Sequence, residues 1–463
     1  MQFLKVSLIF IYKESKLVDI KEHFEYEYLN QLAIDEKIYY SPSVGWDKIN
    51  SKRVNINRDE FLKHIVNRVL SNSYTFTPYK VNLLIKNKDC KPRKTCIPTV
   101  KDRIVISAVK RYLYDFYKEE RFNIPANQII KEITRIIENK EKIFYKKIDL
   151  SSFFDNINHQ ILIEKISKKV DNEIIIDLIK NILENPQKCD ETDKKVKNVI
   201  GVPQGISIAT LFSNIYMHDF DTKYANKKDI SYFRYVDDII IFSKNRIEIA
   251  NIYAEMKYDI ERVLLLSLNM EKTKDGCIEE GLEYLGYKFD GNIITVRKTS
   301  ITKFERNIER VFKNFSVLKE KDETQIKKFI WLLNVKITGI LVDGKKYGWL
   351  YYYSCINDKT LLKKLDLLIE KFIKRFKVDS YISTKDIKKF TKTYFEINNN
   401  IAESKYLLNL NKIEIEEKKK FLKEICLIEN VDSLSEQELD YRYRYNLYRT
   451  LKNLERDIDS ISG

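Results

Sequence analysis

The stretch RYVDDIIIFS, residues 234–243, places two adjacent aspartates, Asp237 and Asp238, inside a run of aromatic and β-branched residues. Residues of those types favour a buried β-strand. An ionised carboxylate is costly to bury unless it is paired or bound to a metal. Two carboxylates about 4 Å apart also repel each other by roughly 4 kcal/mol at an effective dielectric near 20. An exposed Asp-Asp turn in a hairpin would avoid both costs, and bound cations would remove them.

A second strand-like segment, FYKKIDLSSFF (residues 144–154), leads into Asp149. Asp149, Asp237 and Asp238 together are the ligands that a site for two Mg²⁺ ions needs, because Mg²⁺ prefers hard oxygen ligands and keeps positions for water and phosphate. Two such ions about 3.5–4 Å apart hold the attacking and leaving oxygens of an in-line displacement. The three aspartates therefore predict a centre for phosphoryl transfer.

The charge balance agrees with a polyanionic partner. The chain has 463 residues, with 83 Lys and Arg against 68 Asp and Glu, so its net charge is +15. A balance this basic is typical of proteins that bind nucleic acid. A general bias toward lysine would also produce it, so charge alone leaves both interpretations open.

Cysteine and histidine usage excludes several classes of site. The six cysteines form no C-x-x-C pair, and no two of the four histidines lie at metal-ligand spacing. This argues against a zinc site and against a disulfide framework, and it fits the reducing cytoplasm. No apolar run approaches the roughly 20 residues of a membrane helix. The apolar opening MQFLKVSLIFIY (residues 1–12) is interpreted as a core element, since it lacks the features of a signal peptide.

Hydrophobic periodicity predicts an α+β chain. Strand patterns alternate with helix patterns up to about residue 296, and the pattern from about residue 300 is almost wholly helical. Residues 79–100 are expected to form two strands joined by a basic turn. Residues 281–296 are expected to form a β-hairpin with Asp290-Gly291 at its turn.

Several segments resemble, in order, the motifs of reverse transcriptases. KIDLSSFFDNINHQIL (147–162), GVPQGISIATLFSNIYMHDFD (201–221), YVDD (235–238) and LNMEKTK (268–274) resemble the four palm motifs. LEYLGYKF (282–289) resembles the primer-grip hairpin, and KPRKTCIPTVKDRIVISAVKRYL (91–113) resembles the fingers segment that meets the triphosphate.

This resemblance implies a right-hand polymerase fold. We expect N-terminal helices and fingers over residues 1–125, and a palm with an antiparallel sheet over 126–296. A helical thumb is expected over 297–380, and a basic helical C-terminal extension over 381–463. The implied activity is RNA-directed DNA polymerisation, with an RNA template, deoxynucleoside triphosphates and a DNA product.

The resemblance also assigns the metal ligands. Asp149 and Asp237 match the metal-binding aspartates, and Asp238 matches the second acid of the turn. Leu150 would contribute its backbone carbonyl to a metal ion. The implied cofactor is two Mg²⁺ ions, for which Mn²⁺ can substitute.

Further positions match residues that hold the nucleotide and the primer. Phe154 matches the aromatic gate that leaves no room for a ribose 2′-OH, and Gln204 matches a residue that packs on the incoming nucleotide. Gly205 would let the backbone approach it. Arg93 and Arg103 match residues that grip the triphosphate, a task suited to the planar guanidinium. For Phe154, core packing beside Phe153 is the alternative, and for the arginines a solvated basic surface.

Two more roles follow from the same resemblance. Lys272, or alternatively Lys274, matches the lysine that protonates the leaving pyrophosphate. Tyr284, Leu285 and Gly286 are expected to press the primer end toward the metals.

The subtype rests on the segment after the palm. KITGILVDGKKYGWLYYYSCINDKTLLKKLDLLIEKFIKRF (336–376) is similar to the thumb of bacterial defence-associated, abortive-infection-type reverse transcriptases. Retron and group II intron enzymes are more distant. The resemblance implies DNA synthesis in antiphage defence, on a dedicated non-coding RNA or with a companion protein or a homo-oligomer.

The C-terminal segment DYRYRYNLYRTLKNLERDI (440–458) interleaves tyrosines with arginines. Such a pattern suits stacking on bases and contacts with phosphates. One of Tyr441, Tyr443, Tyr445 and Tyr448 could also serve as a protein primer, or the segment could be a basic helix packed on the thumb. Two rival functions stay open, a template-independent or protein-primed nucleotidyl transferase on the same palm and a non-catalytic RNA-binding scaffold.

Overall fold

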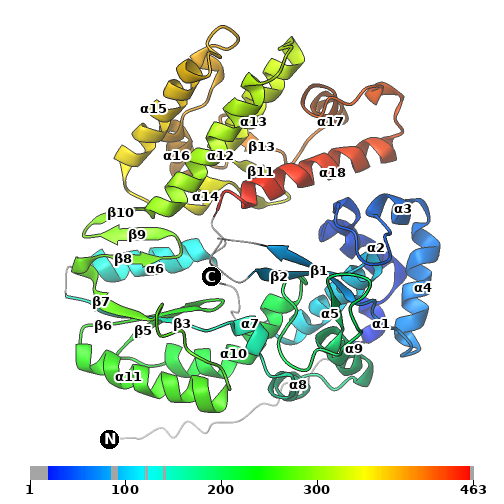
Figure 1. Ribbon diagram of the computed structural model, residues 1–463, viewed down its shortest axis with the longest axis vertical. Helices are drawn as coiled ribbons and strands as arrows, with labels where there is room; N and C mark the ends of the chain where they lie inside the picture. Colours follow the sequence, from blue (N-terminus) through cyan, green and yellow to red (C-terminus); the bar gives the residue numbers. More distant parts are fainter. Residues whose placement is uncertain (1–18, 85–91, 119, 121–123, 139–141, 459–463) are drawn as a thin grey trace, which may run out of the picture.

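The computed structural model describes residues 19–84, 92–118, 120, 124–138 and 142–458, so the segment 1–12 lies outside the described residues. Helices and mostly antiparallel sheets build the described chain, which confirms the expected α+β class. Figure 1 shows a sheet-containing lower part and a helical upper part, with the C-terminal helix α18 crossing between them. Among the helices that the structure describes, none is long and apolar enough to cross a membrane.

A four-stranded antiparallel sheet of order β5-β6-β3-β7 contains most of the stretch 234–243. Its strands are β3 (Phe144–Asp149), β5 (Ser231–Tyr235), β6 (Asp238–Ser243) and β7 (Lys274–Cys277). The predicted buried strand is β6, all six residues of which are buried.

The two faces of β6 belong to different cores, because successive side chains of a strand point to opposite faces. Ile239 and Ile241 join the core that helices α10 (Ala209–Ala225) and α11 (Arg246–Tyr258) cover. Ile240 and Phe242 join the core on the other face. Figure 1 shows α11 running beneath the sheet and the hairpin strands above it.

The second core begins with a three-stranded sheet of order β10-β9-β8. Its strands are β8 (Leu282–Tyr284), β9 (Tyr287–Asp290) and β10 (Ile293–Val296). Asp290 pairs with Ile293 around Gly291, whose φ is 56°, so the predicted Asp-Gly turn is confirmed. An earlier turn at Leu285-Gly286 separates β8 from β9, which the sequence interpretation did not resolve.

The N-terminal part packs into the first core. The predicted strand pair is confirmed as β1 and β2, which pair antiparallel, while β4 joins β1 in parallel. The strands are β1 (Tyr79–Leu84), β2 (Arg93–Ile97) and β4 (Gln187–Lys188). The helices of this part are α1 (Ile20–His23), α2 (Tyr26–Asp35), η1 (Ile38–Tyr40), α3 (Ser51–Ile56), α4 (Arg58–Leu70), α5 (Val100–Phe116) and α6 (Ala126–Glu138). Those between the palm strands are α7 (Phe153–Asn156), α8 (His159–Ser167), α9 (Glu173–Glu184), η2 (Asp259–Val263) and η3 (Ile278–Glu280).

The upper part is mainly helical but is not wholly so, which corrects the expectation for residues beyond 300. A small sheet of order β12-β11-β13 lies within it. Its strands are β11 (Ile340–Val342), β12 (Lys345–Tyr347) and β13 (Leu408–Asn409). The helices are α12 (Lys298–Ser316), α13 (Glu323–Thr338), α14 (Trp349–Tyr352), α15 (Lys359–Arg375), η4 (Thr384–Asp386), α16 (Phe390–Asn399), α17 (Ile415–Lys420), η5 (Phe421–Ile425), η6 (Val431–Ser433) and α18 (Glu436–Glu455).

Gly339 joins α13 to β11 in a backbone conformation that only glycine adopts readily, with φ 66° and ψ −166°. A Cβ atom there would collide with the carbonyl oxygen of Tyr347 and approach the Tyr351 ring. Gly291 has a similar φ of 56°, but nothing lies within 4 Å of its Cβ position.

We therefore expect Gly339→Ala to lower the free energy of unfolding by at least about 3 kcal/mol, because steric overlap adds to backbone strain. Gly291→Ala should lower the free energy of unfolding by only about 1 kcal/mol, because only the left-handed conformation opposes it. Urea denaturation followed by circular dichroism measures both. Equal losses in the two variants would contradict the packing at Gly339.

Candidate active site

The three predicted acids meet at one end of the central sheet. Asp149 is the last residue of β3 and pairs in register with Asp238, the first residue of β6. Asp237 lies in the two-residue turn between β5 and β6. Because side chains two residues apart share a face of a strand, Lys147 and Asp149 lie on the same face. Folding thus brings an acid from near residue 149 beside the pair at the hairpin tip.

Burial makes these carboxylates electrostatically costly. Burial raises the pKa of Asp238 to about 6, and the Lys147 ammonium, 3.2 Å from a carboxylate oxygen of Asp238, offsets this only in part. Burial also raises the pKa of Asp149 above its usual range, with Lys272 acting in the opposite direction from 3.7 Å. Burial and the neighbouring Asp149 raise the pKa of Asp237. The neighbouring lysines thus do not fully offset the cost of burying these carboxylates.

The side chains around the three aspartates have features that oppose and features that favour metal binding. Among the described residues, no three His, Cys, Asp or Glu side chains converge on one point where they could hold a metal ion. Lysines take part of the place of a cation, since Lys147 engages Asp238 and Lys272 engages Asp149. One carboxylate oxygen of Asp237 and one of Asp238 are nevertheless buried without a hydrogen-bond partner among the described residues. Hard, unsatisfied oxygens of this kind suit Mg²⁺ once the lysines move aside.

The backbone after β3 is fixed independently of these side chains. An isolated bridge pairs Leu150 with Leu268, and its flanking bonds run from the Asn269 N–H to the Asp149 carbonyl and from the Ser151 N–H to the Ser267 carbonyl. These two bonds do not use the Leu150 carbonyl, so it stays compatible with the metal-binding role that the resemblance implies.

A cavity of about 650 Å³ opens beside the acids. Its lining includes Arg93, Asp149, Leu150, Phe154, Gln204, Asp237 and Lys272. Most of the residues that the sequence analysis assigned to metal, nucleotide and proton transfer are thus brought to one cavity.

The nucleotide side of the cavity is organised by hydrogen bonds. Arg93 donates through Nε to the side-chain oxygen of Gln204 at 2.6 Å, and Gln204 donates in turn to Asp155 at 3.1 Å. The backbone of Gln204 also accepts from the Cys96 N–H at 2.7 Å. Asp155 was missed by the sequence analysis, although its place one residue after Phe154 puts it within the same motif.

Phe154 and Gly205 have different surroundings from each other. The Phe154 ring is partly buried, lies 5.4 Å from the Phe153 ring and lines the cavity. Gly205, with φ 98°, faces β2, because a Cβ there would lie 2.6 Å from the Thr95 methyl and 2.8 Å from the Cys96 carbonyl oxygen. Glycine is therefore required at position 205 because its backbone lies close to β2. A close approach to a nucleotide is not needed to explain this glycine.

Arg103 does not line the cavity, so the structure does not bring this candidate together with the other nucleotide-binding residues. Its guanidinium donates to the Ser43 carbonyl, and burial lowers its pKa from the usual value. The adjacent Asp102 is buried and bonded to Tyr74 and Thr99. The first turn of α5 is thus used for packing against the N-terminal part.

The predicted primer-grip residues are buried in the structure. The Tyr284 hydroxyl donates to the Asp238 carbonyl at 2.9 Å, and Leu285 accepts at its carbonyl from the Tyr352 hydroxyl at 3.0 Å. A Cβ at Gly286 would lie 2.5 Å from the Tyr353 hydroxyl oxygen. The Tyr284 side chain therefore supports the Asp238 backbone, and the Leu285 backbone carbonyl is bonded to α14. The role of these residues as a primer grip stays a prediction.

Lys272 is the better placed of the two candidate lysines. Its ammonium lies 3.7 Å from Asp149 and its side chain is 56% exposed at the cavity. Lys274 is in β7, where it pairs with Lys147 across the sheet. Asn269, which the sequence analysis missed, accepts from the Lys272 N–H and hydrogen-bonds to Asp149.

A buried guanidinium lies beneath the turn that carries Asp237. Arg234, in β5, forms two bonds to Asp221 at 2.7 and 2.5 Å and one to the Asn214 side-chain oxygen. It also donates to the carbonyl of Val236 at 2.8 Å. Val236 has φ 59°, an unfavourable conformation for a β-branched residue, so the turn is strained and Arg234 holds it.

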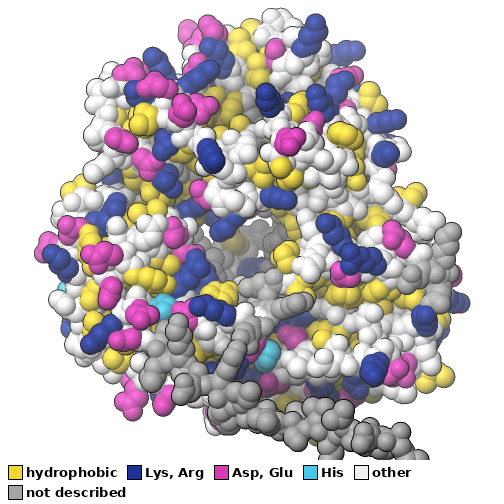
Figure 2. Space-filling model, turned by 180° about the vertical axis from the view of Figure 1, so that it is seen from behind, with side chains coloured by type: hydrophobic (Ala, Val, Ile, Leu, Met, Phe, Trp, Pro, Cys, Tyr) yellow, Lys and Arg dark blue, Asp and Glu magenta, His cyan; other side chains and the backbone are white. Residues whose placement is uncertain are grey.

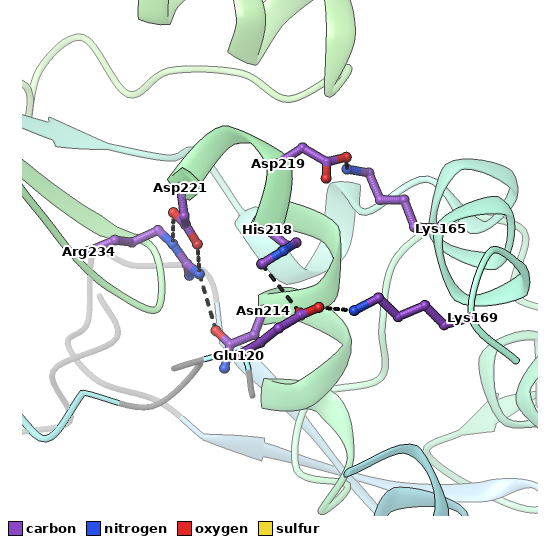
Figure 3. Close-up of polar contacts among 8 residues, drawn as sticks. All are labelled: Glu120, Lys165, Lys169, Asn214, His218, Asp219, Asp221 and Arg234. Carbon is purple, nitrogen blue, oxygen red and sulfur yellow. Dashed lines mark hydrogen bonds and ion pairs between the residues drawn. The ribbon is translucent and has the colours of Figure 1, made fainter. Parts of the chain in front are cut away.

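Figure 3 shows how α10 supplies the partners of Arg234 and is itself held from the other side. Asp221 and Asn214 point toward Arg234, while His218 contacts Glu120 at 3.4 Å. Asp219 accepts from Lys165 of α8 at 2.5 Å. The helix that anchors the turn is thus fixed between the sheet and α8.

The four C-terminal tyrosines are on α18, as the packed-helix interpretation expects. Tyr443 is buried, and Tyr441 packs against Tyr40 with ring centroids 6.0 Å apart. None of the four lines the cavity beside the aspartates.

Replacing Arg234 with Met should lower the free energy of unfolding by about 3 kcal/mol, because Asp221 loses its buried cation and the turn its support. Arg246→Met is the control: it removes an exposed arginine that approaches Asp275 of the same sheet at 3.8 Å, and should cost under about 0.5 kcal/mol. Guanidinium denaturation measures both. Equal, small losses would contradict the role assigned to Arg234.

Comparison with known proteins identifies the domain. Residues 85–289 match the family model described as reverse transcriptase (RNA-dependent DNA polymerase). Protein YkfC of Escherichia coli is 23% identical over 305 residues, covering 56% of this chain and 78% of that protein. The group II intron-encoded protein LtrA of Lactococcus lactis is 26% identical over 171 residues, covering 35% of this chain and 28% of LtrA. The match to LtrA therefore concerns a minor part of a longer protein.

Solved telomerase structures are also similar. Telomerase from Candida tropicalis in complex with a fragment of telomeric RNA has a TM-score of 0.43 at 14% identity, covering 91% of this chain and 68% of that chain. The telomerase complex from Candida albicans has a TM-score of 0.42 at 12% identity, with 89% and 65% covered. The matched family segment spans every residue assigned here from Arg93 to Gly286. Residues 85–289 of the chain therefore correspond to a reverse transcriptase (RNA-dependent DNA polymerase) domain.

Proposed function

We propose that the protein copies RNA into DNA by phosphoryl transfer at Asp149, Asp237 and Asp238, with two Mg²⁺ ions as cofactors. The observation that carries the proposal is the single cavity that joins Asp149 and Asp237 to Arg93, Phe154 and Gln204. An acidic group for cations, a guanidinium for phosphates and an aromatic ring for a sugar are the parts that nucleotide addition requires.

The three aspartates and the Leu150 carbonyl would hold the ions, and Mn²⁺ would substitute for Mg²⁺. Bound there, divalent ions supply Lewis-acid stabilisation of the charge that develops on the phosphoryl oxygens. The chain's own residues provide orientation. Tyr284 fixes the backbone of Asp238, and Arg234 fixes the Val236 turn, so the acids stand on a rigid support.

The residues around the acids divide the remaining tasks. Arg93, already oriented by its bond to Gln204, binds the triphosphate. The Phe154 ring excludes the 2′-OH of a ribonucleotide. Lys272 is an exposed ammonium beside Asp149 and donates a proton to the leaving pyrophosphate.

The biological setting is antiphage defence in the bacterial cytoplasm, with a non-coding RNA as template and a companion protein or a second copy of the chain as partner. The thumb-like segment 336–376 supports this setting through its similarity to defence-associated enzymes.

Asp237→Asn should lower the rate of deoxynucleotide addition to a primer on an RNA template by at least about 10³-fold, because metal binding contributes several kcal/mol to transition-state stabilisation. Asp275→Asn is the control, since Asp275 is a half-exposed carboxylate of the same sheet that pairs with Lys146. Chelation of divalent ions should stop the wild-type reaction, and added Mg²⁺ or Mn²⁺ should restore it.

The product of this assay also distinguishes the proposed function from its two alternatives, a template-independent transferase and a non-catalytic scaffold. A product complementary to the RNA, absent when RNA is omitted, supports the proposal. A product formed without RNA would establish the template-independent transferase, and full biological effect in Asp237→Asn would establish the scaffold.

Phe154→Val should raise the use of ribonucleotides relative to deoxynucleotides by about tenfold or more, because it removes the ring expected to meet the 2′-OH. The ratio of kcat/KM for dGTP and GTP, measured in the same variant, is independent of overall stability. An unchanged ratio would show that Phe154 acts only in packing beside Phe153.

A further inference from the structure

Helix α18 lies between the lower and upper parts (Figure 1). Near its start, Tyr441 and Arg444 pack on Tyr40 of η1, with the guanidinium 5.8 Å from the Tyr40 ring centroid. Just beyond its end, Asp457 is 1% exposed and accepts from Lys336 of α13 and from Asn307 of α12. Both ends of α18 are therefore fixed, one to each part (Figure 1).

The last turns of α18 present two different faces. Leu447, Leu451 and Leu454 are buried in a core with Phe421 and Val431. Lys452, Glu455 and Arg456 are exposed and fall at the i, i+3 and i+4 spacing of a single helical face. These three side chains lie outside that core.

That polar face lines a second cavity of about 860 Å³. The opposite wall consists of the segment from Gln204 to Thr210 and of Tyr235 and Val236, directly before Asp237. Figure 2 shows a hollow at the centre of the molecule with Lys and Arg side chains at its rim.

The two cavities share part of their lining but differ in their balance of charge. Both are lined by Arg93, Phe154 and Gln204. The lining of the first has three carboxylates and three cations, namely Asp149, Asp155, Asp237, Arg93, Lys94 and Lys272. In the second, the cations are Arg93, Lys303, Lys452 and Arg456, and Glu455 is the one acid among the lining residues that the structure describes. The first cavity thus balances acids with cations, whereas the second has an excess of cations, which suits phosphates.

We propose that the end of α18 is a substrate-binding wall, where Lys452 and Arg456 bind the phosphodiester backbone of the template–primer duplex opposite the Gln204–Thr210 segment. This inference rests on the proposed function and extends it to residues beyond the matched family segment, 85–289. Ammonium and guanidinium groups that contact phosphates release condensed counterions, so they contribute both affinity and salt dependence.

The test compares two variants that lose the same charge from the same helix. Lys452→Ala/Arg456→Ala removes the two cations from the cavity. Arg442→Ala/Arg449→Ala removes two cations that do not line it, and Arg442 makes an intrahelical pair with Glu438 much as Lys452 does with Glu455. The probe is a fluorescent RNA template annealed to a DNA primer, and its affinity is measured by anisotropy across a series of salt concentrations.

We expect the Lys452/Arg456 variant to bind at least about tenfold more weakly at low salt and to lower the slope of log K against log salt by about 1.5 to 2. The Arg442/Arg449 variant should keep the wild-type slope. All four residues are exposed or half-exposed, so both variants should fold, and matching thermal melting curves check this.

Two results would overturn the inference. Equal slopes in the two variants would show that the α18 charges act only at long range. Tighter binding by the Lys452/Arg456 variant would show that the end of α18 obstructs the cavity. In either case, normal primer extension by the wild-type protein leaves the proposed function intact, whereas a wild type that neither binds nor extends the duplex refutes the proposed function itself.

Discussion

The crowding of three carboxylates at one end of an antiparallel sheet is the constraint on which the rest of the site depends. The register that pairs Asp149 with Asp238 leaves these acids no freedom to separate by backbone movement. The Val236 turn that carries Asp237 adopts a strained conformation, and a buried network of Arg234, Asp221 and Asn214 keeps it there. Bringing like charges together lowers the stability of the fold, and such a cost is common at functional sites.

Two lysines show how the protein tolerates this crowding without bound cations. Lys147 approaches Asp238 and Lys272 approaches Asp149, yet burial still raises the pKa of Asp238 to about 6. Under the proposed function, divalent ions take over the role of these ammonium groups, because they meet hard oxygens that the lysines leave unsatisfied. Lys272, the more exposed of the two, would then be free to serve the leaving group.

The order of the motifs was enough to predict which residues meet at the cavity beside the aspartates. The features that it did not predict depend on tertiary contacts. Asp149, Asp237 and Gln204 were predicted because each belongs to a motif whose spacing reflects a local strand or turn. The place of Arg103 away from the cavity could not be predicted, because nothing in its own segment indicates that it contacts Ser43, 60 residues earlier. The small sheet escaped prediction because its strands have two or three residues, too few to show periodicity, and β13 joins β11 from 68 residues later along the chain (340 to 408).

Crystals grown with Mn²⁺ and a non-hydrolysable deoxynucleoside triphosphate, measured at the manganese absorption edge, would test the central claim most directly. The account predicts anomalous peaks at coordination distance, about 2.1 Å for ions of this kind, from the carboxylates of Asp149 and Asp237, with Lys272 moved away from Asp149. An absence of manganese at these acids, with Lys272 and Lys147 still paired to them, would contradict it.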